Sequence, residues 1–243
     1  GAAAMMRRPF SFSALTRMRI RRRPLLYALL LGALASPFAS AKAIEPLPGV
    51  PAAIDPTQHY LIYLHGRIFE GRNAKASDPR FGSYEFEAIV HALAAQGAVV
   101  IAEHRSMDTD IGEYATHVAA QGRQLLAAGV PATNIGVVGF SKGGYIAVLT
   151  AARLHDPAIN YVFLASCGET LFQREDVDGA GRMLSIREST DSLGRSCEPL
   201  FEAASTPGEY EEIEIHTGHA HGAFYRPNPQ WVHPSLRWLR LAQ

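Results

Sequence analysis

A short stretch near the middle of the chain limits the possible folds most strongly. Residues 135–138 form the apolar run Ile-Gly-Val-Val, residues 139–143 read Gly-Phe-Ser-Lys-Gly, and an apolar helix-like run follows at 145–154. Between a strand and a helix, the Gly-x-Ser-x-Gly pattern predicts a sharp turn that holds its serine in a strained backbone conformation. Glycine suits the flanking positions because the two backbones crowd there. The stretch therefore predicts that Ser141 is a nucleophile.

Apolar runs and helix-like segments alternate along the chain from residue 44 onward. Strands that are apolar on both faces and alternate with helices predict a mostly parallel, doubly wound α/β sheet with helices on both faces. Ligand sites in such sheets lie at the carboxyl ends of the strands. We expect one domain over residues 44–243, with a proline-rich lead-in at 44–58. The predicted strands are 60–64, 98–102, 135–138, 161–166, 183–186 and 211–215, and the predicted helices are 84–96, 111–128, 145–154 and 234–241.

The first 43 residues differ sharply in charge from the rest of the chain. They carry eight basic residues and no acidic ones, which leaves 15 basic and 23 acidic residues in the remainder. An acidic domain disfavours nucleic-acid binding, because phosphate contacts need clustered lysine and arginine. We therefore expect a small-molecule partner rather than a nucleic acid.

The same N-terminal segment is typical of a secretory signal peptide. A basic stretch at 19–23 precedes an apolar stretch at 25–34, and small residues that suit cleavage follow at 39–43. We interpret the four residues before Met5 as a cloning remnant. The alternative is an uncleaved membrane anchor, although the uncharged run 24–41 is barely long enough to span a bilayer. Cleavage would leave no membrane span, and we expect a periplasmic or extracellular protein.

The chain contains two cysteines, Cys167 and Cys197. In an exported protein, two cysteines predict one disulfide bond. The alternative is a pair of buried free thiols.

A serine nucleophile needs a base, usually a histidine oriented by a carboxylate. Three histidines follow the last predicted strand: His216, His219 and His221. They come after the serine and the candidate acids, which gives the chain order serine, acid, histidine. For the acid, Glu188 and Asp191 follow the 183–186 strand, and Glu169 is a rival after the preceding strand. A turn or helix-capping role is the alternative for Asp191.

The site also needs backbone N–H groups that stabilise the developing oxyanion. One is expected from Lys142, which directly follows the nucleophile. The other is expected from Arg67, because His65 and Gly66 follow the first predicted strand and Gly66 lets the backbone turn inward. The His65 side chain is then predicted to be structural.

These segments resemble the α/β-hydrolase superfamily, its esterases and lipases in particular. Residues 64–66 look like the oxyanion motif, 139–143 look like the nucleophile elbow, and 217–222 look like the Gly-x-x-His-Gly segment, which selects His221 as the base. Asp191 stands where the family places its acid. The resemblance implies a serine hydrolase that cleaves carboxylic esters or related acyl bonds, such as thioesters and amides, with a small-molecule acyl substrate, no cofactor and no metal. Together with the N-terminal segment, it predicts an exported enzyme.

Two departures from the family pattern shape the expected site. Little room precedes the 60–64 strand for additional antiparallel strands, and residues 167–182 are too few for a cap domain. We therefore expect a minimal fold with an open pocket. A Cys167–Cys197 bridge would flank Asp191 and brace its loop.

Three other readings stay open. The glycine-rich turn 136–144 could hold a phosphate at a helix N-terminus, but the Walker spacing fails because Ser141 precedes Lys142. The three C-terminal histidines could hold a metal, but no acidic or cysteine partner stands beside them at a zinc-ligand spacing. A non-catalytic binding protein on the same fold is the third.

Overall fold

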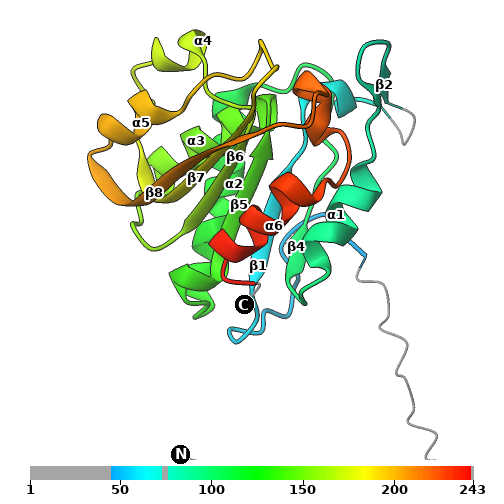
Figure 1. The fold of residues 1–243 in the computed structure, drawn as a ribbon. Coiled ribbons are helices and arrows are strands. Elements are labelled where there is room, and N and C mark those ends of the chain that lie inside the picture. Colours follow the sequence, from blue (N-terminus) through cyan, green and yellow to red (C-terminus); the bar gives the residue numbers. More distant parts are fainter. Residues whose placement is uncertain (1–44, 73–75, 242–243) are drawn as a thin grey trace, which may run out of the picture. The chain divides into compact units, whose positions relative to one another are not determined.

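Six parallel strands form the central sheet of the computed structural model, which describes residues 45–72 and 76–241 (Figure 1). Every hydrogen-bonded pair of neighbours in this sheet is parallel. All six predicted strands are present, so the predicted fold class is confirmed. In spatial order the strands are β4 (Val99–Ile101), β1 (Tyr60–Leu64), β5 (Ile135–Phe140), β6 (Asn160–Leu164), β7 (Ala180–Glu188) and β8 (Thr206–Ile215).

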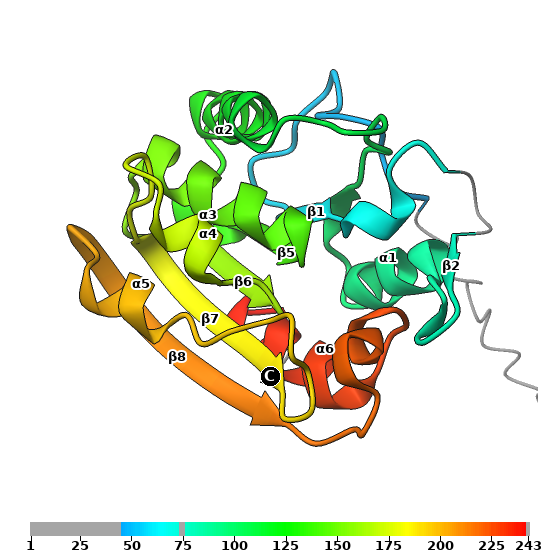
Figure 2. The same ribbon diagram turned by 90° about the horizontal axis from the view of Figure 1, so that it is seen from above.

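Helices cover both faces of the sheet, as Figure 2 shows from above. The residues of α2 (Ile111–Ala127) and α3 (Lys142–Leu154) contribute to the core on one face. Those of α1 (Phe86–Ala94) and α6 (Pro229–Trp238) contribute to the core on the other. The short helices α4 (Glu169–Phe172) and α5 (Glu198–Glu202) lie on the α2 and α3 side.

The central strands are buried on both faces because successive side chains point to opposite sides. In β1, Tyr60, Ile62 and Leu64 face the α2 and α3 core, whereas Leu61 and Tyr63 face the α1 and α6 core. This double burial explains why the strand sequences read as continuous apolar runs. No helix among the described residues is long and apolar enough to cross a membrane. The predicted signal segment, 1–43, lies outside these residues.

The last helix begins earlier than predicted. It was expected to start at Pro234, but it starts at Pro229. The Asn228 side chain caps it by accepting a hydrogen bond from the Gln230 N–H (2.9 Å), and proline at the first helical position loses no intrahelical bond. Pro234 instead lies inside the helix.

The edges of the sheet also differ from the predictions. β7 and β8 extend beyond the predicted 183–186 and 211–215. β8 is an edge strand and can therefore tolerate polar residues that hide the strand pattern. At the opposite edge, Leu47 of the lead-in pairs with Ile101 of β4.

The loop after β1 contains η1 (Arg67–Phe69) and a small hairpin of β2 (Ser77–Asp78) and β3 (Gly82–Ser83). Two further short helices are η2 (Ala132–Asn134) and η3 (Ala220–Phe224).

Cys167 and Cys197 form the predicted disulfide bond, with their Cα atoms 5.2 Å apart. Both residues are fully buried. The bond joins the segment after β6 to the start of α5, and the Arg195 N–H also donates to the Cys167 carbonyl at 2.9 Å. The segment that carries Asp191 is therefore closed into a covalent loop.

Removing this bond should destabilise the fold. A bridge across 30 residues restricts the unfolded chain enough to contribute roughly 3–4 kcal/mol. We expect the double variant Cys167→Ala and Cys197→Ala to lose about that much free energy of unfolding in equilibrium urea denaturation. Reduced wild type is the control, and it should lose a similar amount. A loss below about 1 kcal/mol in both samples would contradict the prediction.

Candidate active site

Ser141 occupies a strained turn between β5 and α3. Its backbone angles are φ 53° and ψ −118°, in a region that residues other than glycine rarely adopt. The Ser141 N–H donates to the Leu164 carbonyl of β6 at 2.9 Å, and the Ser141 carbonyl accepts from the Gly144 N–H at 2.9 Å. The turn is therefore fixed by bonds to the neighbouring strand and to the helix that follows it.

Three glycines allow the backbones to meet at this turn. A Cβ at Gly139 would overlap the Gly143 carbonyl, and a Cβ at Gly143 would overlap the Leu64 carbonyl at the end of β1. A Cβ at Gly144 would overlap Ser166. The first turn of α3 thus lies directly against the loop that leaves β1, which explains the sequence requirement at these positions.

Asp191 and His221 meet although 30 residues separate them. The Asp191 Oδ2 and His221 Nδ1 atoms are 2.7 Å apart, and the side chains are only 1% and 8% exposed. The other Asp191 oxygen accepts the Leu193 N–H at 2.8 Å. The Phe140 ring packs beside the imidazole, with the ring centres 4.8 Å apart. This arrangement orients the imidazole through Nδ1 and leaves Nε2 for proton transfer.

The alternative residues lie elsewhere. His219 is exposed, and His216 is exposed and lies 3.8 Å from Glu214. Glu169 is exposed in the first turn of α4, where its carboxylate accepts from the Gln173 side chain at 3.4 Å. Of the histidines and acids considered from the sequence, the structure pairs His221 with Asp191.

Glu188, the remaining acid candidate, ties the two loops of the site together. One oxygen accepts the Thr190 N–H (2.7 Å) and hydroxyl (2.6 Å), and the other accepts the N–H groups of Thr217 (3.0 Å) and Gly218 (2.9 Å). Burial pushes the pKa of Glu188 up, but these hydrogen bonds outweigh it and hold the pKa below its usual value. Glu188 thus connects the loop of Asp191 to the loop of His221.

The two predicted oxyanion donors begin adjacent helices. Arg67 is the first residue of η1, and Lys142 is the first residue of α3. A Cβ at Gly66 would lie 2.8 Å from the Phe140 ring, so the loop after β1 runs against the nucleophile turn. Within the described part of the chain, neither backbone N–H donates a hydrogen bond to another backbone group.

Ser141 and His221 line the same cavity, whose volume is about 530 Å³. Among the hydrogen bonds of the described residues, none joins the Ser141 hydroxyl to His221, and such contacts often tighten only when substrate binds. Two exposed apolar side chains, Met107 and Leu193, line this cavity. Its other lining residues are Arg67, Ile68, Arg72, Asp78, Arg80, Phe81, Phe140 and Tyr225.

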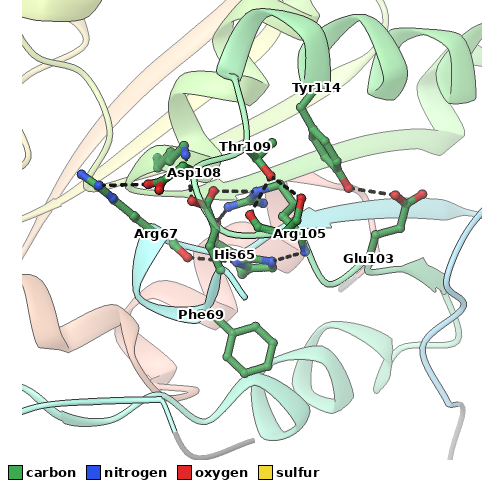
Figure 3. Close-up of polar contacts among 12 residues, drawn as sticks. His65, Arg67, Phe69, Glu103, Arg105, Asp108, Thr109 and Tyr114 are labelled. Atoms are coloured by element: carbon green, nitrogen blue, oxygen red, sulfur yellow. Dashed lines mark hydrogen bonds and ion pairs between the residues drawn. The ribbon is translucent and has the colours of Figure 1, made fainter. Parts of the chain in front are cut away.

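A buried carboxylate links the nucleophile turn to the loop after β1. Glu70 is fully buried, and its two oxygens contact Lys142 Nζ (2.8 Å) and Arg105 Nε (3.2 Å). The Arg105 guanidinium also donates to the His65 carbonyl (Figure 3). The side chain of Lys142, inside the Gly-x-Ser-x-Gly pattern, is therefore held by an acid that sequence reasoning did not single out.

Replacing Glu70 should strongly destabilise the protein. Glu70→Gln leaves Arg105 buried without its counterion, and breaking a buried ion pair costs about 3–5 kcal/mol. Equilibrium urea unfolding would measure the loss. The control is Asp108→Asn, which breaks the exposed Arg67–Asp108 pair and should cost less than about 1 kcal/mol. Equal losses in the two variants would contradict the prediction.

The His65 side chain is structural, as predicted. Its Nε2 atom accepts the Arg105 N–H at 3.0 Å, and its Nδ1 atom lies 2.9 Å from the Gly66 carbonyl, so Nδ1 carries the proton (Figure 3). Burial, with a further contribution from the Arg105 charge, lowers the pKa of His65 to about 3. The ring is therefore neutral at physiological pH and holds the loop after β1 against Arg105.

This pKa predicts a loss of stability in acid. Unfolded chains protonate His65 below about pH 6.5, whereas the folded protein resists protonation down to about pH 3. Stability should thus fall with decreasing pH through this window, by at most about 1.4 kcal/mol per pH unit from this group. We expect urea unfolding of His65→Gln across this range to show a shallower slope than wild type. His233→Gln, on the exposed side of α6, is the control and should keep the wild-type slope.

The described residues contain no group of three or more His, Cys, Asp or Glu side chains that could hold a metal ion. His216, His219 and His221, weighed as a metal site from the sequence, have different surroundings: two are exposed, and the third is held by Asp191.

Comparison with known proteins gives structural neighbours only. No protein-family model matches the sequence, and no curated protein matches it. An esterase/lipase from an uncultured bacterium superposes with a TM-score of 0.52 at 12% identity, covering 80% of this chain and 78% of the other. For a structure described as an arylesterase the TM-score is 0.51 at 13% identity, with 76% of each chain covered. A fungal esterase structure from Rhizomucor miehei superposes with a TM-score of 0.51 at 14% identity, covering 83% of this chain and 76% of the other. At these identities, the similarity is one of fold.

Proposed function

We propose that this chain, which has the α/β-hydrolase fold of these neighbours, is a serine hydrolase that cleaves carboxylic esters. The observation that carries the proposal is the buried Asp191–His221 hydrogen bond beside the cavity that Ser141 lines. The strained backbone of Ser141 supports it, because strain of this kind concentrates at functional turns. The esterase names of the neighbours are consistent with it but are not its basis.

The proposed reaction passes through an acyl-enzyme. The Ser141 hydroxyl attacks the ester carbonyl while His221 Nε2 accepts its proton, and Asp191 stabilises the resulting imidazolium. The backbone N–H groups of Arg67 and Lys142 stabilise the oxyanion. The alkoxide leaves with the proton from His221, and a water molecule that His221 deprotonates then releases the acid. The same steps apply to thioesters and amides, and ester cleavage is the reaction that we propose to test first.

We also propose that the protein works outside the cytoplasm. The Cys167–Cys197 bond supports this, because structural disulfides persist in oxidising compartments. The basic and then apolar N-terminal segment, with small residues after it, supports the same inference.

Removal of a triad member should nearly abolish turnover. We expect Ser141→Ala and His221→Ala to lower kcat/KM for 4-nitrophenyl butyrate by about four orders of magnitude or more, and Asp191→Asn to cause a loss of similar order. Initial rates of 4-nitrophenol release would measure this. A fluorophosphonate probe should label the wild type and should not label Ser141→Ala.

Two matched variants serve as controls for these losses. His219→Ala removes the alternative base, and Glu169→Gln removes the rival acid. Both should keep wild-type rates within a few fold. A wild type that neither hydrolyses the ester nor reacts with the probe would support a non-catalytic binding protein instead.

A further inference from the structure

The cavity at Ser141 has a charge opposite to that of the domain around it. Residues 44–243 carry 15 basic and 23 acidic side chains. The cavity lining contains three arginines, Arg67, Arg72 and Arg80, and one acid, Asp78. A cleft lined by one sign of charge concentrates ligands of the opposite sign. We propose that the substrate is an ester that carries an anionic group, a carboxylate or phosphate, near its scissile bond; this inference rests on the proposed hydrolase function.

Of the three cavity arginines, Arg72 makes the fewest side-chain contacts with other polar groups of the described residues. Among the described residues, Arg72 takes part in no ion pair: no carboxylate oxygen lies within 4.0 Å of the Arg72 guanidinium. The residues outside the described ranges contain no aspartate or glutamate side chain. Arginine presents a planar fork that binds carboxylate or phosphate with two hydrogen bonds. Arg72 is therefore the primary contact for the anion.

Arg67 is held only weakly by a protein acid. A single contact of 3.3 Å joins its Nη2 atom to Asp108, and the two side chains are 73% and 74% exposed (Figure 3). Exposed pairs of this kind contribute about 0–1 kcal/mol. A substrate anion can thus replace Asp108 at little cost. The Arg67 N–H is also a proposed oxyanion donor, so the Arg67 backbone, from which the side chain extends, would lie beside the reacting carbonyl.

Arg80 differs because Asp78 already binds two nitrogens of its guanidinium. Its Nε and Nη2 atoms each lie 3.2 Å from an oxygen of Asp78, and its guanidinium stacks on Phe81 with 4.6 Å to the ring centre. Arg80 therefore shapes the wall of the cavity, and Arg67 and Arg72 bind the anion.

The apolar part of the lining suits the rest of the same ligand. Three large hydrophobic side chains are exposed among the described residues, and two of them, Met107 and Leu193, border this cavity. A substrate with a hydrocarbon segment and an anionic end would cover these side chains and pair with the arginines. A neutral short-chain ester would offer no anion to Arg72 or to the weakly held Arg67.

Paired substrates test the inference. The acyl pair is mono-(4-nitrophenyl) adipate against 4-nitrophenyl hexanoate, and the leaving-group pair is 3-acetoxybenzoate against phenyl acetate. For each pair, the ratio of kcat/KM for the anionic ester to kcat/KM for the neutral one is measured at low ionic strength. We expect Arg72→Gln to lower this ratio about tenfold in at least one pair, which identifies the side of the ester that carries the anion. Added salt should lower the wild-type ratio in the same pair.

Three further variants separate recognition from general effects of charge or packing. Arg72→Lys keeps the charge and should restore part of the ratio. Arg237→Gln removes the same charge from the exposed side of α6 and should leave the ratio unchanged. Asp108→Asn releases Arg67 and should raise the ratio, and asparagine tolerates the positive φ of 55° at this position.

The possible failures are distinguishable. If the wild type hydrolyses 4-nitrophenyl hexanoate but Arg72→Gln changes neither ratio by more than about twofold, the anionic-substrate inference is overturned and the proposed hydrolase stands. If the wild type cleaves none of the four esters and takes up no fluorophosphonate, the hydrolase proposal fails, and this inference fails with it.

Discussion

The close approach of α3 to the end of β1 is the constraint on which the rest of the site depends. It exists because Gly139 and Gly143 carry no side chain where two backbones meet. This contact brings the Ser141 turn beside the Gly66 loop, and the proposed oxyanion donors belong to these two segments. The buried Glu70 carboxylate then joins the same two segments through Lys142 and Arg105. Backbone packing thus sets the geometry, and a buried ion network reinforces it.

Most of the fold could be predicted from the sequence, because buried parallel strands and the nucleophile turn have strong local signals. Apolar runs predicted the six strands, and the helix-like segments between them predicted helices on both faces. The presence of two cysteines predicted the Cys167–Cys197 bond. The start of α6 was mispredicted because Pro234 resembles a helix start, whereas the Asn228 cap gives a weaker signal. The full length of β8 was missed because an edge strand can carry polar residues.

The site was predictable only where chain order carries information. Ser141 follows β5, Asp191 follows β7 and His221 follows β8. The structure joins the last two residues directly. Glu70, Arg105 and Glu188 were not predictable in their roles, because their partners are distant in sequence and a single acid or arginine resembles any surface charge. The grouping of the Arg67, Arg72 and Arg80 side chains was missed for the same reason: all three belong to the loop after β1, and only the folded structure shows that they line one cavity.

The disulfide has a consequence for survival among proteases. Asp191 and the exposed Leu193 lie in an irregular stretch, and such stretches are preferred cleavage sites. A cut there falls inside the loop closed by Cys167 and Cys197, so both new ends stay attached to one molecule. The Glu188 contacts to Thr190 and Gly218 would still hold the upstream end in place. A chain closed in this way can be cut beside the exposed Leu193 without losing either fragment.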